Sequence, residues 1–509
     1  MAGGNGSSLL DQRAARRALS EARGKQKLDL LFSAPDPGKL VRSLPPEELY
    51  LALLDIGPDD AAEIVAMSTP EQFRHFIDMA AWPGADEGPK PTEVLRWLRL
   101  AREGRGHNDA RFRGQLSSLD VELLALVLRR EMKVYDLGED DHARPANPEL
   151  AWYTPDRRFM LEFTGEAEFS AMRHLIEDLY QRDDATAGRL IEATRWEQPA
   201  ELEEAARRWR NGRLRDLGVP EFEEALAFYA RPAKAPKLPE TTSTALTVPK
   251  RNLLEAALAQ LSGPELEDAE ESLVYAANAA LVANRVPLDD AAEVREQLAQ
   301  ARATLALGLE LLSGGDATRA ARVLVETPIR NVFQTAMGEA YRLQTRARTI
   351  AASARLPQAE SATLLDEPLG DAVDALLKPR PLFAEPGQRR PRAFGSRAEV
   401  AGAEALLDEA EAVVELLEAL GISPAALGPK AEEAGLGPAA FKASDAIWAL
   451  VESQIRGEPF SLRALAQEGR LKSPGFVQGL DDLFQNAMGG SHSETLQRAA
   501  QRIRARLIS

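Results

Sequence analysis

Histidines and clustered carboxylates are the residues of this sequence that could bind a metal or move a proton. The five histidines stand at positions 75, 107, 142, 174 and 492, and no two have the spacing with which one helix presents both to a zinc ion. The densest run of hard oxygen ligands is Glu139-Asp140-Asp141-His142, which suits a divalent cation. A solvated acidic turn after a strand explains the same run, and we prefer that interpretation. The sequence therefore leaves metal binding undecided.

Nucleophilic and phosphate-binding motifs are missing from the sequence. No serine stands in a nucleophile-elbow pattern, and the chain has no cysteine. The run Gly3-Gly4-Asn5-Gly6-Ser7-Ser8 lacks the preceding strand and the lysine of a phosphate-binding loop. His75 lies beside the apolar face of a predicted helix, where a packed histidine is the simpler explanation. We therefore expect no catalytic residue and no cofactor-binding residue.

Three arginine-rich runs are candidate contacts for an acidic partner. The densest is Arg207-Arg208-Trp209-Arg210-Asn211-Gly212-Arg213-Leu214-Arg215, and an aromatic ring among arginines also suits nucleic acid. We favour a structural interpretation, in which acids open this helix at Pro199, arginines close it, and Asn211-Gly212 forms a left-handed cap. Arg389-Arg390-Pro391-Arg392 and the run from Arg498 to Arg506 are interpreted in the same way. Both remain possible contact points for an acidic partner.

Charge and hydropathy exclude several partners. The chain has 62 Lys and Arg against 79 Asp and Glu, a net charge of −17, which repels phosphate backbones and anionic lipid. We therefore expect protein partners and no nucleic acid. The first 26 residues have no apolar core of signal-peptide length, and no apolar stretch approaches the roughly 20 residues that span a bilayer. These features predict a cytoplasmic protein without an integral membrane segment.

A short repeat predicts the first helices. Pro46, Pro58 and Pro70 are 12 residues apart, and each is followed by an acid. Proline at the first helical position followed by an acid is typical of a helix start. Apolar residues recur at the third, sixth and seventh positions after each proline, on one face of each helix. They are Leu49, Ala52, Leu53, Ala61, Ile64, Val65, Phe73, Phe76 and Ile77. Such helices bury their stripes by stacking, which predicts a small right-handed superhelix.

Two runs in this repeat resemble a known family. Leu44-Pro45-Pro46-Glu47-Glu48-Leu49 and Pro58-Asp59-Asp60-Ala61-Ala62-Glu63-Ile64-Val65 resemble the intracellular N-terminal domain of MgtE-type magnesium transporters. The resemblance covers residues 28–102 and extends more distantly to the repeats of the flagellar switch protein FliG. It implies the superhelical fold and raises magnesium as a partner. The whole chain also resembles an uncharacterised bacterial family, a domain of unknown function, which implies no mechanism.

Magnesium binding does not follow from the residues themselves. Glu47, Asp59, Asp60 and Glu71 stand where acids compensate helix dipoles, and magnesium held by protein groups alone is uncommon. The transporter's ion sites lie between its helical domain and a following domain that we do not identify in this sequence. None of its ligands is therefore carried over to this chain, and magnesium is the least favoured of the partners considered.

The fold class that we predict is mainly α, as a chain of helical modules with one small β segment. The only period-two patterns are a strand at Lys133–Leu137 and a hairpin at Trp152–Phe163, whose second arm alternates apolar and polar residues. We place boundaries where proline, arginine and glycine gather, as at Pro232, Pro236, Pro239 and Pro249. The predicted segments are a flexible tail at 1–27, the superhelix at 28–115, a mixed α+β segment at 116–230, a linker at 231–250, a helical domain at 251–365, a linker at 366–398 and a C-terminal helical module at 399–509.

A non-catalytic protein-interaction, scaffold or regulatory function follows best from these patterns, because repeated helices present extended faces and linkers let modules act separately. Two alternatives remain. One is an enzyme whose site is assembled around residues 133–163. The other is a regulator that responds to a divalent cation.

Overall fold

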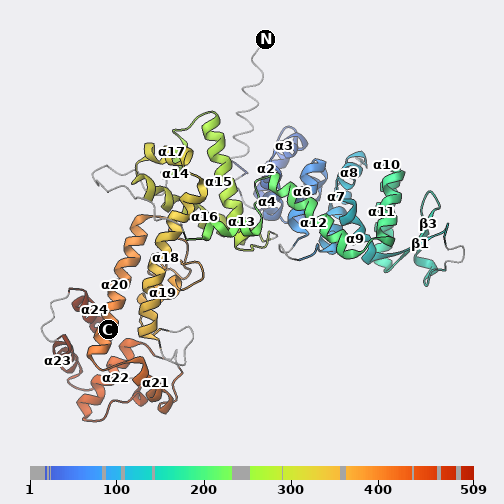
Figure 1. Cartoon of the computed structure of the whole chain (residues 1–509). Coiled ribbons are helices and arrows are strands. Elements are labelled where there is room, and N and C mark those ends of the chain that lie inside the picture. The colour runs from blue at the N-terminus through green and yellow to red at the C-terminus, as the bar shows by residue number, and fades with distance from the viewer. Residues whose placement is uncertain are drawn as a thin grey trace. The chain divides into compact units, whose positions relative to one another are not determined.

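The chain is mainly helical and forms two compact units. The computed structural model describes residues 18–19, 22, 24–82, 87–104, 109–139, 144–231, 253–288, 290–355, 363–437, 441–466, 472–488 and 494–508. Unit 1 comprises residues 1–223 together with 281–297, and unit 2 comprises residues 224–280 and 298–509. Among the described residues, the only sheet has three strands and lies in unit 1 (Figure 1). This confirms the predicted fold class.

Unit 1 begins with short helices in series. They are α2 (Lys25–Phe32), α3 (Pro37–Ser43), α4 (Pro46–Ile56), the 3₁₀ turn η1 (Pro58–Ala61), α5 (Ala62–Met67), α6 (Pro70–Ala80), α7 (Pro91–Glu103), α8 (Asp109–Leu116) and α9 (Val121–Glu131). Three of these begin at the prolines of the repeat, as predicted. Leu53, Val65 and Ile77 are fully buried, so the repeat's apolar stripe is the inner face of the stack.

The helices stack by packing each one against the second that follows it. From α2 on α4 to α7 on α9, every such pair is in contact. Gln72 joins the third repeat to the end of α3, because its side chain completes a capping box with Thr69 and also donates to the carbonyls of Val41 and Leu44. The end of α7 meets α5 so closely that a Cβ at Gly104 would lie 2.0 Å from the carbonyl oxygen of Ala62. Only glycine fits there.

The predicted flexible tail ends earlier than residue 27. Helix α2 begins at Lys25, and Lys27 is buried with its ammonium 2.7 Å from the carboxylate of Asp55. The carboxylate of Asp55 also pairs with Arg295, which belongs to the 281–297 segment of unit 1. The hydroxyl of Tyr50 donates to the carbonyl of Leu288 in the same segment. These contacts hold a distant piece of chain against α4.

The sheet lies where the sequence predicted it. Strand β1 (Met132–Asp136) and strand β2 (Ala151–Tyr153) both pair antiparallel with the central strand β3 (Phe159–Phe163). The alternating pattern of β3 predicted that every second side chain would face solvent. All five residues are instead buried. Glu162 is buried because its carboxylate accepts from the hydroxyl of Tyr135 at 2.7 Å and from the amide of Asn147 at 2.6 Å. A polar side chain on the outer face is thus covered by its own hydrogen-bond donors.

Unit 1 continues in α10 (Glu166–Arg182), α11 (Asp184–Trp196) and α12 (Pro199–Asp216). The predicted cap at Asn211-Gly212 is wrong, because α12 runs through both residues and the left-handed residue is Gly218, with φ of 75°. Arg213 lies inside the helix. Its guanidinium contacts the carboxylate of Asp78 at 2.8 Å and that of Asp120 at 2.7 Å.

Unit 2 contains a large apolar core whose residues run from Leu307 in α16 to Leu507 in α24. Helix α13 (Phe222–Leu226) spans the boundary between the two units. The further elements are η3 (Ala227–Tyr229), α14 (Leu253–Leu258), α15 (Pro264–Ala283), α16 (Ala291–Ser313), α17 (Ala317–Glu326), α18 (Ile329–Ala354), α19 (Leu369–Leu376), α20 (Arg397–Ala419), α21 (Pro424–Glu433), α22 (Ala443–Arg456), η5 (Arg463–Ala466), α23 (Phe476–Met488) and α24 (Glu494–Ile508). No helix in the described ranges has both the length and the apolar character to cross a membrane.

The two predicted linkers differ in what the structure says of them. Pro232 to Pro249 lie outside the described residues. Residues 366–398, by contrast, contain α19 and bury Phe383 and Phe394, whose rings pack 5.4 Å apart. The second proline-rich segment is therefore a packed part of unit 2 rather than an exposed linker.

The ion-pair fork of Arg213 predicts a large loss of stability in unit 1 when this side chain is removed. Removing the guanidinium in Arg213→Met leaves the carboxylate of Asp120 without its arginine and that of Asp78 with only the charge of Arg210 nearby, which should cost about 3–5 kcal/mol. The free energy of unfolding, measured by urea denaturation, checks this. The matched control is Arg208→Met on the same helix, where the exposed arginine makes no ion pair with a described residue and the change should stay within about 0.5 kcal/mol. Equal losses in the two variants would contradict the prediction.

Because residues 281–297 belong to unit 1, cleavage of the chain between residues 232 and 252 should not separate the two fragments. The C-terminal fragment carries this segment, which belongs to unit 1 and contacts Tyr50 and Asp55 there. After cleavage at a protease site inserted in this stretch, we expect the fragments to stay associated on size-exclusion chromatography in native buffer and to separate in urea. Two folded fragments that elute apart, the result that a plain linker would give, would contradict this.

Candidate functional site

Helix α24 is the arginine-rich run at the end of the chain. Its apolar residues Leu496, Ala499, Ala500, Ile503 and Leu507 recur at helical spacing and are buried. The arginines fall between them along the helix, and the last of them, Arg506, lies in the final turn, where it meets the negative end of the helix dipole. They are Arg498, Arg502, Arg504 and Arg506. This buried stripe packs α24 against α20. The packing determines how the arginines of α24 are placed relative to α20.

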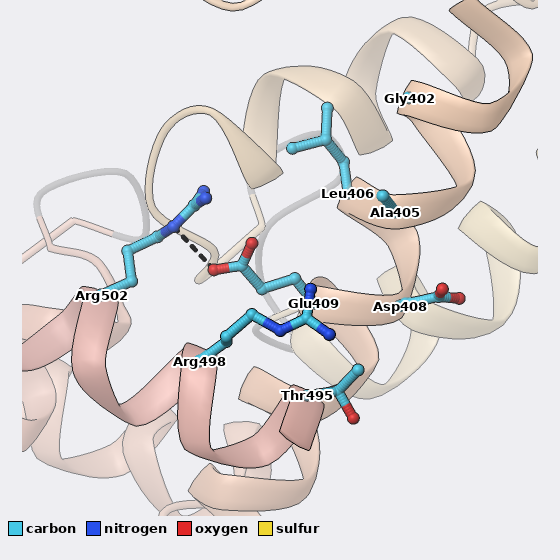
Figure 2. A pocket seen from close by; sticks show the side chains of 8 residues that line it. All are labelled: Gly402, Ala405, Leu406, Asp408, Glu409, Thr495, Arg498 and Arg502. Carbon is cyan, nitrogen blue, oxygen red and sulfur yellow. Dashed lines mark ion pairs between the residues drawn. The ribbon is translucent and has the colours of Figure 1, made fainter. Parts of the chain in front are cut away.

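A hollow of about 200 Å³ lies between these two helices. We call it the α20–α24 groove and define it by its lining residues Gly402, Ala405, Leu406, Asp408, Glu409, Thr495, Arg498 and Arg502 (Figure 2). Helix α20 contributes small residues and carboxylates, whereas α24 contributes a hydroxyl and two guanidinium groups. The groove therefore offers charged side chains beside an α20 wall formed by Gly402, Ala405 and the apolar side chain of Leu406.

Both carboxylates that line the groove already have partners. Glu409 is mostly buried, and one of its oxygens lies 2.6 Å from Nε of Arg502. Asp408 points away from α24 in Figure 2 and pairs at 2.7 Å with Arg346 of α18. Arg346 also binds Glu411, and its hydrogen bonds to that carboxylate are the main reason that its pKa is raised. Each carboxylate that lines the groove thus has an arginine partner within unit 2.

The arginines are less completely paired. Arg502 uses Nε for Glu409, and its two terminal nitrogens make no hydrogen bond to a described residue. The side chain of Arg498 is 66% exposed, and among the described residues its ion pair is with Glu494, which is 88% exposed and 3.8 Å away. An ion pair between exposed groups at that distance contributes little. The groove therefore presents guanidinium nitrogens that can accept another carboxylate.

A second, smaller hollow of about 70 Å³ continues along α24 and shares Arg502 with the groove. Here Arg506 lies 3.1 Å from the buried carboxylate of Asp366. That carboxylate also accepts from the backbone amide and the hydroxyl of Ser444, at 3.0 and 2.6 Å. Asp366 is thus satisfied by three donors, and Arg506 serves to fasten α24 to the start of α22. We therefore assign Arg506 a structural role.

The two other arginine runs serve internal contacts, as the sequence favoured. In α12, Arg210 donates to the carbonyl of Asp78, Arg213 forms the fork described above, and Arg207 pairs with Glu203. Arg215 pairs with Glu221, and Arg208 lies over the ring of the exposed Trp209. In the second run, Arg392 binds Glu385 and Glu399 and lies over the ring of Phe383.

His75 is a packed residue rather than an exposed ligand. It is 3% exposed, its ring contacts that of Tyr50 edge-on, and neither ring nitrogen has a hydrogen-bond partner among the described residues. Burial, and secondarily the positive charge of Arg210, lowers the pKa of His75 to about 4. The imidazole is therefore neutral at physiological pH.

The predicted metal and enzyme candidates are only partly within the described residues. Asp140, Asp141 and His142 lie outside them, as do Gly3 to Ser8, whereas Glu139 pairs with Arg195 at 3.2 Å. Asp59, at a repeat start, pairs with Arg96 at 2.8 Å. In the described part of the chain, no three His, Asp or Glu side chains gather as a metal site would require.

In the mixed segment around the sheet, the polar side chains hydrogen-bond to one another. Glu162 accepts from Tyr135 and Asn147, and Asp156 accepts from the hydroxyls of Thr154 and Tyr180. Burial first, and then the charge of Asp156, raises the pKa of Tyr180, so its hydroxyl stays protonated. These bonds tie the hairpin to α10. The two hollows beside α24 are both remote in sequence from this segment.

Sequence reasoning identified the arginines of α24 but missed the groove beside them. Gly402 and Ala405 carry no signal of their own in an alanine-rich helix. Both are exposed in α20, and nothing lies within 4 Å of the position that a Cβ on Gly402 would occupy. They line a groove only because α24 packs beside them, and α24 follows some ninety residues later in the chain.

Comparison with known proteins places the whole chain in one group. The model of a family described as "Family of unknown function (DUF6178)" matches residues 7–503. No curated protein and no solved structure matches the chain. The match extends over both units and includes both sides of the α20–α24 groove.

The neutral, buried His75 predicts a specific sensitivity to acid. The unfolded chain binds a proton on this residue below about pH 6.5, whereas the folded chain does so only below about pH 4. Stability is therefore full above pH 6.5 and falls as the pH drops through this window, by about 2 kcal/mol between pH 7 and pH 5. His75→Leu should lose that part of the dependence in urea denaturation, with His174→Leu, at an exposed position, as the matched control. Parallel pH profiles for wild type and His75→Leu would show that the imidazole is not responsible.

Proposed function

We propose that this chain, which belongs to the DUF6178 family, is a non-catalytic protein-interaction protein that receives a segment of a partner in the α20–α24 groove. The observation that carries the proposal is the state of the charges there. Asp408 and Glu409 each pair with an arginine of unit 2, whereas Arg498 and the terminal nitrogens of Arg502 make no hydrogen bond to a described residue. Arginine is enriched at protein–protein interfaces and among the residues that contribute most to binding.

The stacked helices of unit 1 support a scaffold function in the same protein. Each helix from α2 to α9 contacts the second one along, so the stack presents a continuous outer face. The resemblance of residues 28–102 to the intracellular domain of MgtE-type transporters is in keeping with such a face. We retain the cytoplasm as the proposed location.

The two alternative functions have less support. An enzyme around residues 133–163 needs polar groups that converge on a substrate, but Glu162 and Asp156 are used in hydrogen bonds within the sheet and to α10. A cation-responsive regulator needs carboxylates free to bind, but Asp59 and Glu139 each face an arginine. Neither alternative has an observation that favours it over protein binding.

Site-specific photo-crosslinking in native cells tests the proposed function. A photoreactive amino acid at Ala405, whose exposed side chain lines the groove, should give one covalent adduct with a protein that mass spectrometry identifies. The same amino acid at Val325, an exposed residue of α17 in the same unit, is the matched control. Adducts that are equally weak at both positions would refute a partner in the groove.

A further inference from the structure

We propose that the segment received in the α20–α24 groove is an acidic amphipathic helix of another protein. In this arrangement the helix packs on Gly402 and Ala405 and places carboxylates one turn apart on Arg498 and Arg502. The inference rests on the function proposed above, and it adds the chemistry and secondary structure of the partner.

The spacing of the arginines indicates a pair of carboxylates. Arg498 and Arg502 are four residues apart on α24, so they lie on one face about 5–6 Å apart at their Cβ atoms. Acids four residues apart on a second helix have the same separation. Arg498 gives up only a 3.8 Å contact with the exposed Glu494, whereas a new carboxylate can bind its fork at two points.

The charges on the opposite wall do not oppose an acidic ligand. Asp408 is turned toward Arg346, and Glu409 is held by Nε of Arg502. A small free anion finds only the partly engaged guanidinium groups and the hydroxyl of Thr495 here. A helix gains in addition the contact with the small residues of α20, which explains why both kinds of residue line the same hollow.

The walls of the groove favour a helix over an extended segment. Both walls are helices, and the backbone groups in the middle of a helix are already hydrogen-bonded, so α20 and α24 cannot pair with a strand. A helix brings its own satisfied backbone. It can also approach α20 closely, because Gly402 and Ala405 project almost no side chain and the space above Gly402 is open.

The net charge of the chain argues for another protein rather than a second copy. A second copy brings a further net charge of −17 to the encounter. A partner with a smaller net charge avoids this long-range repulsion.

Peptide binding to the full chain tests the inference. The probe is a fluorescently labelled, designed amphipathic helix with leucines on one face and glutamates at four-residue spacing, and the matched probe has glutamine in place of each glutamate. Fluorescence anisotropy should show that the glutamate peptide binds roughly tenfold more tightly than the glutamine peptide. Arg498→Glu should remove that advantage, and a lysine peptide should bind this variant better than the wild type.

Two further variants keep the result interpretable. Arg498→Gln removes the charge without reversing it and should give an intermediate affinity, and circular dichroism reports whether either variant is folded. Arg208→Glu alters an exposed arginine of unit 1 and should leave peptide binding unchanged.

The possible failures separate this inference from the proposed function. Equal binding of the glutamate and glutamine peptides, or no binding of the glutamate peptide, would overturn the acidic helix, whereas an adduct at Ala405 would still uphold the proposed function. If light scattering finds a dimer that Arg498→Glu dissociates, the occupant is a second copy and the inference of another protein is wrong.

Discussion

The fork that Arg213 forms with Asp78 and Asp120 is the constraint on which the arrangement of unit 1 depends. It joins α6, the residue that precedes α9, and α12 through a single guanidinium. Burial opposes the charge on Arg213, but its hydrogen bonds to the two carboxylates outweigh that cost and raise its pKa. Because a buried charge without a partner is very unfavourable, the three elements can hold this charge only in one register.

A second buried cation lies beside this fork. Arg210 donates to the carbonyl of Asp78 and packs over the ring of Trp82, and burial lowers its pKa to about 10, so it stays charged at neutral pH. His75 lies within the field of this charge. The positive charges of Arg210 and Arg213 balance the negative charges of Asp78 and Asp120 only while His75 is neutral. The packing of the aromatic rings around Tyr50 and the charge balance of α12 are therefore coupled.

The features predicted correctly from sequence are those that short-range chemistry determines. Pro46, Pro58 and Pro70 mark helix starts because proline costs no hydrogen bond there, and the period-two runs mark the strands of the sheet. The sequence could not show the partners of Arg213, because Asp78 lies 135 residues before it. The prediction of a helix cap at Asn211-Gly212 was wrong for the same reason, namely that long-range contacts are not visible in the sequence. A dipeptide that usually ends helices is overridden here by tertiary contacts that continue on both sides of it.

The placement of residues 281–297 in unit 1 has a consequence for the synthesis of the protein. A ribosome that has finished residue 223 has made most of unit 1, yet it must add almost sixty residues of unit 2 before the segment that contacts α4 begins to emerge. At translation rates of about 5–20 residues per second, this delay is roughly 3–12 s. During that time the acidic side chain of Asp55 has Lys27 but lacks Arg295, and the nascent α4 leaves the hydroxyl of Tyr50 to water. Completion of the first unit is thus a late event in translation, and it follows the appearance of α15.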